Sequence, residues 1–139
     1  MYEFAIGEGA DGIISTLYYG LTEPWSILYV FVPQHAILSV FEAFLMIRLL
    51  LSGLFFGLYA RKYSDNHYAI STAALCYTFS GWFMFWIQAP NLLTAGMLFP
   101  LLLYSMDIAF DKKKYTPLLL ITALMYISNY YMGMTTSFI

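Results

Sequence analysis

The chain has little charge and almost no cysteine. Only 10% of its 139 residues are charged and 61% are hydrophobic, whereas a soluble domain is about 25% charged. This composition excludes an ordinary soluble domain and predicts an integral membrane protein. Six basic residues are too few for a nucleic-acid-binding surface, so no nucleic-acid partner is expected. The single cysteine, Cys76, excludes an internal disulfide and a cysteine-based metal site.

The first residues do not predict a signal peptide. Met1-Tyr2-Glu3 has no basic residue, and Glu8 and Asp11 interrupt the stretch where an apolar segment should follow. The chain begins in this acidic segment and ends at 135–139 (TTSFI) with no terminating tail. We therefore expect it to be a piece of a longer membrane protein.

Long apolar runs fill most of the remaining sequence. Residues 36–60 carry only two charges, and about 20 apolar residues suffice to cross a bilayer. The sequence predicts an all-α, polytopic membrane protein, whose four-span bundle over 36–139 has transmembrane helices at 36–60, 69–88, 92–110 and 117–139. Pro100 should kink the third helix, and Pro117 suits the first turn of the fourth.

Residues 1–35 are predicted to form a loop with short interfacial or re-entrant helices. Asp11 is suited to cap a helix over 12–21 that is too short to cross the membrane. A second apolar run, Trp25–Val32, is shorter still, and its tryptophan is typical of the headgroup level.

The basic residues predict the orientation. Arg61, Lys62 and the three lysines at 112–114 fall in the connections 61–68 and 111–116, which alternating spans place on one side. The positive-inside rule makes that side cytoplasmic and makes residues 1–35 extracytoplasmic. We expect a multi-pass protein of a plasma membrane, with membrane lipid as its surroundings.

Arg48 is the one basic residue inside a predicted span. An arginine there costs roughly 2.5–3.5 kcal/mol on insertion scales, which predicts a partner or a task. Counted along the helices, Arg48 and Asn129 lie at similar depth and Glu42 lies near the outer boundary. Gly53 and Gly57, four residues apart, are typical of close helix packing.

Several stretches, taken in order, resemble the YfhO-type bacterial membrane proteins. They are Gly7-x-Gly9-x-Asp11, Tyr18-Tyr19 ahead of Glu23-Pro24, RLLLSGLFFGLYARKY (48–63), LCYTFSGWFMFW (75–86), LFPLLL (98–103) and ISNYYMGM (127–134). One departure is Leu92-Leu93-Thr94, where the family often has WLD, so the role of that aspartate does not carry over.

The resemblance implies a glycosyltransferase-like protein of the GT-C fold. Such proteins are expected to transfer a sugar from an undecaprenyl-phosphate carrier, a polyprenyl-phosphate sugar donor, to an envelope polymer acceptor such as lipoteichoic acid. This chain would cover part of the first outer loop and the next four spans. The preceding span and its catalytic-loop motif are not in this chain, so we expect no turnover from it alone.

The resemblance also gives the polar residues their candidate roles. Asp11 and Glu8 are candidate catalytic bases, because sugar transfer needs a carboxylate to deprotonate the acceptor hydroxyl. Asp11 as a helix cap and Glu8 as a solvated carboxylate are the alternatives. Arg48 is a candidate ligand of the carrier phosphate, reached by extending its side chain outward. Its alternative is a structural arginine bonded to Asn129, Gln88 or a backbone carbonyl.

Three further residues are candidate substrate contacts. Glu42 could bind an acceptor hydroxyl, Trp86 could stack on a sugar, and Asn129 is either a substrate contact or a bond between helices. No metal site is predicted, because His35 and His67 fall on opposite sides, although carboxylates could hold a divalent cation.

Two alternatives to an enzyme remain open. One is a non-catalytic membrane module, either a transporter fragment or a helper subunit, and the other is an inactive truncated product. A transporter would favour helices broken near the membrane midplane, and the sequence predicts only the interruption at Pro100.

Overall fold

The structure is a computed structural model that describes residues 2–3, 10–11, 24–129 and 133–135. The predicted all-α class is confirmed for these residues, with one small addition. Strands β1 (Tyr2–Glu3) and β2 (Ala10–Asp11) pair antiparallel, two residues each. The helices are α2 (Pro24–Tyr29), η2 (Gln34–Ala36), α3 (Ile37–Ala60), α4 (His67–Thr78), α5 (Gly81–Phe85), η3 (Trp86–Gln88), α6 (Pro90–Lys112) and α7 (Thr116–Ser128).

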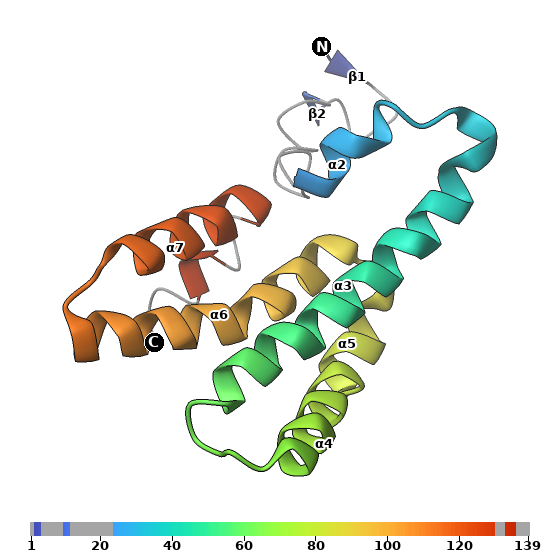
Figure 1. The fold of residues 1–139 in the computed structure, drawn as a ribbon. Coiled ribbons are helices and arrows are strands. Elements are labelled where there is room, and N and C mark those ends of the chain that lie inside the picture. Colours follow the sequence, from blue (N-terminus) through green and yellow to red (C-terminus); the bar gives the residue numbers. More distant parts are fainter. Residues whose placement is uncertain (1, 4–9, 12–23, 130–132, 136–139) are drawn as a thin grey trace.

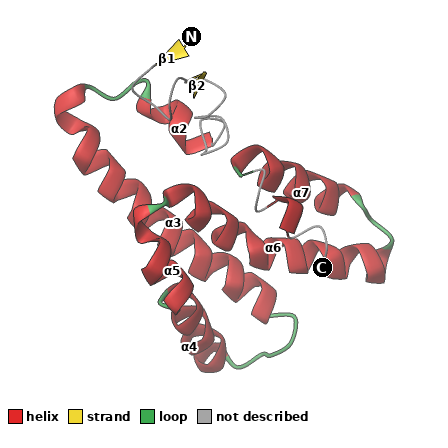
Figure 2. Ribbon diagram, turned by 180° about the vertical axis from the view of Figure 1, so that it is seen from behind, coloured by secondary structure: helices red, strands yellow, loops and turns green. Residues whose placement is uncertain are grey.

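Helix α6 lies at the centre of the helical assembly. It packs between α3 and α7, while α4 returns along α3 and α2 lies near the first half of α3 (Figures 1 and 2). The two connections that carry Arg61, Lys62 and Lys112–Lys114 lie at the same end of the molecule, as the charge pattern predicts (Figure 1). We call this end the basic end.

Two helices in the described part of the chain are long and apolar enough to cross a membrane. They cover Gln34–Ala60 and Leu92–Lys112, and α7 is a shorter apolar helix. Only 17% of the most apolar window of the first is buried, against 50% for the second. Most of α3 therefore faces outward, whereas α6 contacts other helices along much of its surface.

The hydrophobic core lies where α3, α6 and α7 meet. Met97, Leu98 and Leu102 of α6 form a buried cluster with Met125 of α7, and Leu51 of α3 is among the residues packed against it. Burying apolar side chains cannot itself drive helices together in lipid, so this contact is held by close packing.

The predicted continuous helix over 69–88 is wrong. It is interrupted at Phe79 and Ser80, between α4 and α5. The Thr78 hydroxyl donates to the Ala74 carbonyl (2.9 Å), one turn earlier, and such back-bonding weakens a helix. Ser80 then has extended backbone angles and precedes Gly81, so two weak helix formers follow each other.

Pro100 lies inside α6, which runs without a break from Pro90 to Lys112. A proline has no amide hydrogen, so the carbonyl four residues earlier, that of Gly96, loses its helical donor. The Tyr77 hydroxyl donates to this carbonyl at 2.7 Å. The ring of Tyr77 also stacks on Phe56, with centroids 4.7 Å apart. Tyr77 therefore replaces the missing hydrogen bond and joins α4 to α3 and α6.

Gly53 and Gly57 face α4, which confirms their predicted role in close packing. A methyl group on Gly53 would lie 2.7 Å from the Thr78 hydroxyl oxygen, whereas one on Gly57 would lie 3.9 Å from Ile70. The tighter contact is thus at Gly53.

The fourth predicted helix, 117–139, is shorter than expected. Helix α7 ends at Ser128, and Asn129 has extended backbone angles. Serine and asparagine side chains compete for backbone hydrogen bonds, which favours an end at this point. The predicted helix over 12–21 lies outside the described residues.

Candidate functional site

A buried polar layer lies next to the hydrophobic core, on the side away from the basic end. Arg48, Thr94, Ser128 and Asn129 are each at most 5% exposed. Arg48 lies one turn before Leu51, and Thr94 one turn before the α6 core residues. Helix α7 runs in the opposite direction to α6. Ser128 and Asn129 lie about one turn after Met125, the core residue of α7. Three helices therefore contribute polar groups at one level, and we call these four residues the buried polar layer.

Arg48 is the only charged member of the layer and is 1% exposed. Its guanidinium carbon lies 5.2 Å from the centre of the Trp25 ring. Such a cation–π contact is worth roughly 0.5–2 kcal/mol, more when water is excluded. Of the two alternatives for Arg48, the structure therefore does not show a side chain that extends outward to the surface.

Helix α2 supplies the tryptophan that covers this arginine. The rings of Trp25 and Tyr29 each lie 5.2 Å from the ring of Phe44, which is one turn before Arg48 on α3. Two aromatic contacts thus fix α2 against α3. Trp25 was expected at the headgroup level, and sequence analysis gave no indication that it would contact Arg48.

Asn129 joins the end of α7 to the next part of the chain. Its amide donates to the Met125 carbonyl (2.9 Å), and its carbonyl accepts from the Gly133 amide (2.8 Å). A side chain on Gly133 would lie 2.9 Å from the Tyr126 ring. The motif at 127–134 therefore owes part of its pattern to a close backbone turn.

The other predicted site residues are not brought to Arg48 by any described contact. Glu42 is exposed on α3 and makes no ion pair within the described ranges. The ring over the arginine is that of Trp25, whereas Trp86 packs against Phe85 at 4.9 Å. The backbone of Asp11 lies in β2, and Glu8 lies outside the described residues.

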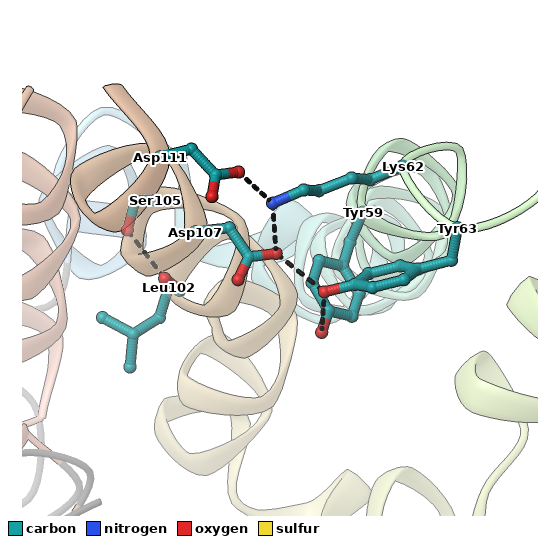
Figure 3. Close-up of polar contacts among 7 residues, drawn as sticks. All are labelled: Tyr59, Lys62, Tyr63, Leu102, Ser105, Asp107 and Asp111. Carbon is teal, nitrogen blue, oxygen red and sulfur yellow. Dashed lines mark hydrogen bonds and ion pairs between the residues drawn. The ribbon is translucent and has the colours of Figure 1, made fainter. Parts of the chain in front are cut away.

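A second polar cluster at the basic end was missed by the sequence analysis. Lys62 forms ion pairs with Asp111 (2.7 Å) and Asp107 (3.1 Å), and Tyr63 donates to Asp107 (2.8 Å) (Figure 3). We call these four residues the Lys62 clamp. It ties the end of α3 to the last turns of α6. Residues 62 and 111 each lie close to the end of a long helix. Comparing these two positions in the sequence would have indicated the ion pair.

The clamp also shifts the pKa values of its members. The hydrogen bond from Lys62 to Asp111 raises the pKa of the lysine above 10.5, so the ammonium group stays charged at neutral pH. The pKa of the Tyr63 hydroxyl is raised by its hydrogen bond with Tyr59 and then by Asp107. The cluster is therefore a fixed ion pair and not a proton donor near neutral pH.

No group of three or more His, Cys, Asp or Glu side chains that could hold a metal ion forms among the residues that the structure describes. The buried polar layer itself contributes one cation, two hydroxyl groups and one side-chain amide.

The family model described as bacterial membrane protein YfhO matches residues 1–139. The chain belongs to this family. No curated protein and no solved structure matches the chain. Membership of the YfhO family, together with the long apolar helices, establishes a polytopic membrane protein. In this YfhO chain, the Trp25 ring covers the buried Arg48, and the Lys62 clamp lies at the basic end.

Proposed function

We propose that this YfhO segment is part of an envelope glycosyltransferase that acts on the outer face of the plasma membrane. The sugar would pass from an undecaprenyl-phosphate carrier to an envelope polymer such as lipoteichoic acid. The observation that carries the proposal is the buried Arg48 within the buried polar layer. An ionisable residue inside a membrane segment is a candidate functional site because burying it there is costly.

Arg48 is suited to the leaving group of this reaction. Transfer breaks the bond between the sugar C1 atom and a phosphate oxygen, and the electron pair stays on the carrier phosphate. A guanidinium group binds phosphate through two parallel hydrogen bonds, and it does so most strongly where water is excluded. In this proposal, Arg48 stabilises the departing phosphate, and Asn129 contributes its amide from the same layer.

The acceptor side of the reaction needs a carboxylate. A base must take the proton of the polymer hydroxyl as the new bond to C1 forms. Asp11 and Glu8 are the proposed bases. Glu42 lies six residues, or about 9 Å along the helix, from Arg48 and is the proposed contact for an acceptor hydroxyl. Trp86 is the proposed stacking surface for the sugar.

Access to Arg48 requires a movement of α2, because Trp25 covers the guanidinium group. Helix α2 has six residues and is held to α3 by ring contacts. We therefore include in the proposal an opened state in which Trp25 leaves the arginine and the carrier phosphate takes its place.

Binding of undecaprenyl phosphate to the purified chain in lipid nanodiscs tests the first step. Arg48→Gln should weaken binding at least tenfold, whereas Lys114→Gln, an equal charge change at the basic end, should leave it unchanged. Trp25→Leu should strengthen binding, because the competing ring is lost. Equal affinity of the wild type and Arg48→Gln would overturn the role of the arginine.

Sugar transfer by the parent protein tests the reaction itself. Arg48→Ala and Asp11→Ala should each lower the amount of glycosylated polymer. Unchanged glycosylation with both variants would remove both residues from the site.

A second candidate, a transport module, is favoured by the interruption of the helix at Phe79–Ser80. The break lies about halfway along the predicted span 69–88, where transporters place broken helices. Proteoliposomes distinguish the two: transport moves a labelled solute into the lumen with no labelled polymer formed, and transfer gives the reverse.

A further inference from the structure

A groove lies between the ends of α3 and α6 at the basic end. Leu58, Tyr104 and Ile108 give it an apolar floor, and its charged lining residues are Arg61, Lys62, Asp111 and Lys112. Its cavity volume is 340 Å³, which is within the range of small-ligand sites at roughly 300–1,000 Å³. An apolar floor with a charged rim at the end of two membrane helices is typical of the boundary between lipid tails and headgroups.

The charged residues of this groove differ in whether they already form an ion pair. The Lys62 clamp uses Asp111 and Asp107, since both carboxylates bond to Lys62. Arg61 and Lys112 are exposed and form no ion pair with any residue that the structure describes. The two remaining cations therefore come from different helices and lie on the lining of one groove. An anion between them would meet positive charge from both sides.

A second, mostly apolar groove starts from the same arginine and runs between α3 and α4. Gly53, Gly57, Ile70 and Ala74 are among its lining residues, and Arg61 belongs to both grooves. We call this groove the crease; its cavity volume is 460 Å³. A chain of methylene groups lying in it would have its polar end at Arg61.

We infer that this face binds an anionic diacyl phospholipid. Its phosphate would lie between Arg61 and Lys112, and one acyl chain would follow the crease beside Gly53 and Gly57. Charge complementarity selects an anionic over a zwitterionic headgroup. The phosphate position at Arg61 lies 13 residues, or about 20 Å along the helix, from Arg48, so the inference does not rest on sugar transfer.

The first test compares lipids on the wild-type chain. Delipidated protein in detergent is given phosphatidylglycerol or phosphatidylcholine of the same acyl chains, and bound lipid is counted by native mass spectrometry. Retention of phosphatidylglycerol alone supports the inference. Equal retention of both lipids overturns it, and so does equal competition by undecaprenyl phosphate or by glycerol phosphate, which has no acyl chains.

The second test separates a site from a diffuse surface charge. Arg61→Gln with Lys112→Gln should weaken phosphatidylglycerol binding about 30-fold, at roughly 1 kcal/mol for each cation near the surface. Lys113→Gln with Lys114→Gln is the matched control, because it removes the same charge from the same end outside both grooves. An equal loss in both double variants means diffuse attraction only and overturns the inference. Because the lipid comparison uses the wild type, the inference stays falsifiable if a variant does not fold.

Discussion

Replacing Tyr77 by phenylalanine removes one hydroxyl group and leaves the Gly96 carbonyl without the donor that Pro100 makes necessary. The ring and its stacking on Phe56 are kept, so the change isolates the 2.7 Å hydrogen bond. A hydrogen bond contributes about 0.5–1.5 kcal/mol net, and measured values between membrane helices average roughly 0.6 kcal/mol. We expect Tyr77→Phe to lower the free energy of unfolding by about 1 kcal/mol.

The decisive measurement is a double-mutant cycle with Pro100→Ala. Alanine at position 100 has an amide hydrogen, which can donate to the Gly96 carbonyl within the continuous helix α6. Tyr77→Phe should then cost no more than half as much in the Pro100→Ala background. The coupling free energy between the two positions should be about 0.5 kcal/mol.

Unfolding of the purified chain in mixed micelles, titrated with a denaturing detergent and followed by circular dichroism, gives these free energies. Tyr68→Phe makes the same chemical change on an exposed ring of α4 and should cost nothing in either background. If Tyr77→Phe costs the same with proline and with alanine at position 100, the argument that one tyrosine replaces the missing helical donor is refuted.

Three further predictions concern packing, charge and orientation. Gly53→Ala should destabilise the chain by roughly 1–3 kcal/mol because its methyl group would lie 2.7 Å from a threonine oxygen, while Gly57→Ala, with 3.9 Å of room, should be tolerated in the same unfolding assay; similar effects of both would contradict this. The pKa of Lys62 is raised in the folded chain, so the stabilising contribution of this lysine is present below pH 10.5 and is lost as the pH rises beyond that value. When unfolding is measured below and above pH 10.5, the wild type should therefore lose more stability than Lys62→Gln. An equal loss in both would exclude a role for the clamp. Lys114→Cys in a Cys76→Ser chain should react with a membrane-impermeant thiol reagent only in opened cells, and labelling of intact cells would reverse the proposed orientation.

The long apolar helix α3 and the common end of the basic connections could be predicted because they depend on averages over many residues. The apolar run from Ile37 is long enough to predict a long helix, whatever packs against it. The glycine pair at 53 and 57 was also predictable, since helical spacing alone places both on one face.

The break after α4 and the cover over Arg48 could not be predicted in the same way. A hydropathy pattern does not distinguish a straight helix from one interrupted at Phe79–Ser80, because both are equally apolar. The pattern also could not show which group bonds the Gly96 carbonyl, since the donor that replaces the Pro100 amide comes from Tyr77 on another helix. The contact between Trp25 and Arg48 depends on how the chain turns between them, which no periodicity encodes.

The central position of α6 has a consequence for biosynthesis. At roughly 5–20 residues per second, the ribosome completes α3 several seconds before α6 and α7 emerge. During this interval Thr94 and Asn129 of the buried polar layer have not yet been made, whereas Trp25 of α2, which covers Arg48 in the complete fold, has. The tryptophan of α2 would then protect the arginine while the nascent chain waits for its later helices, and its loss should first be visible as slower membrane insertion.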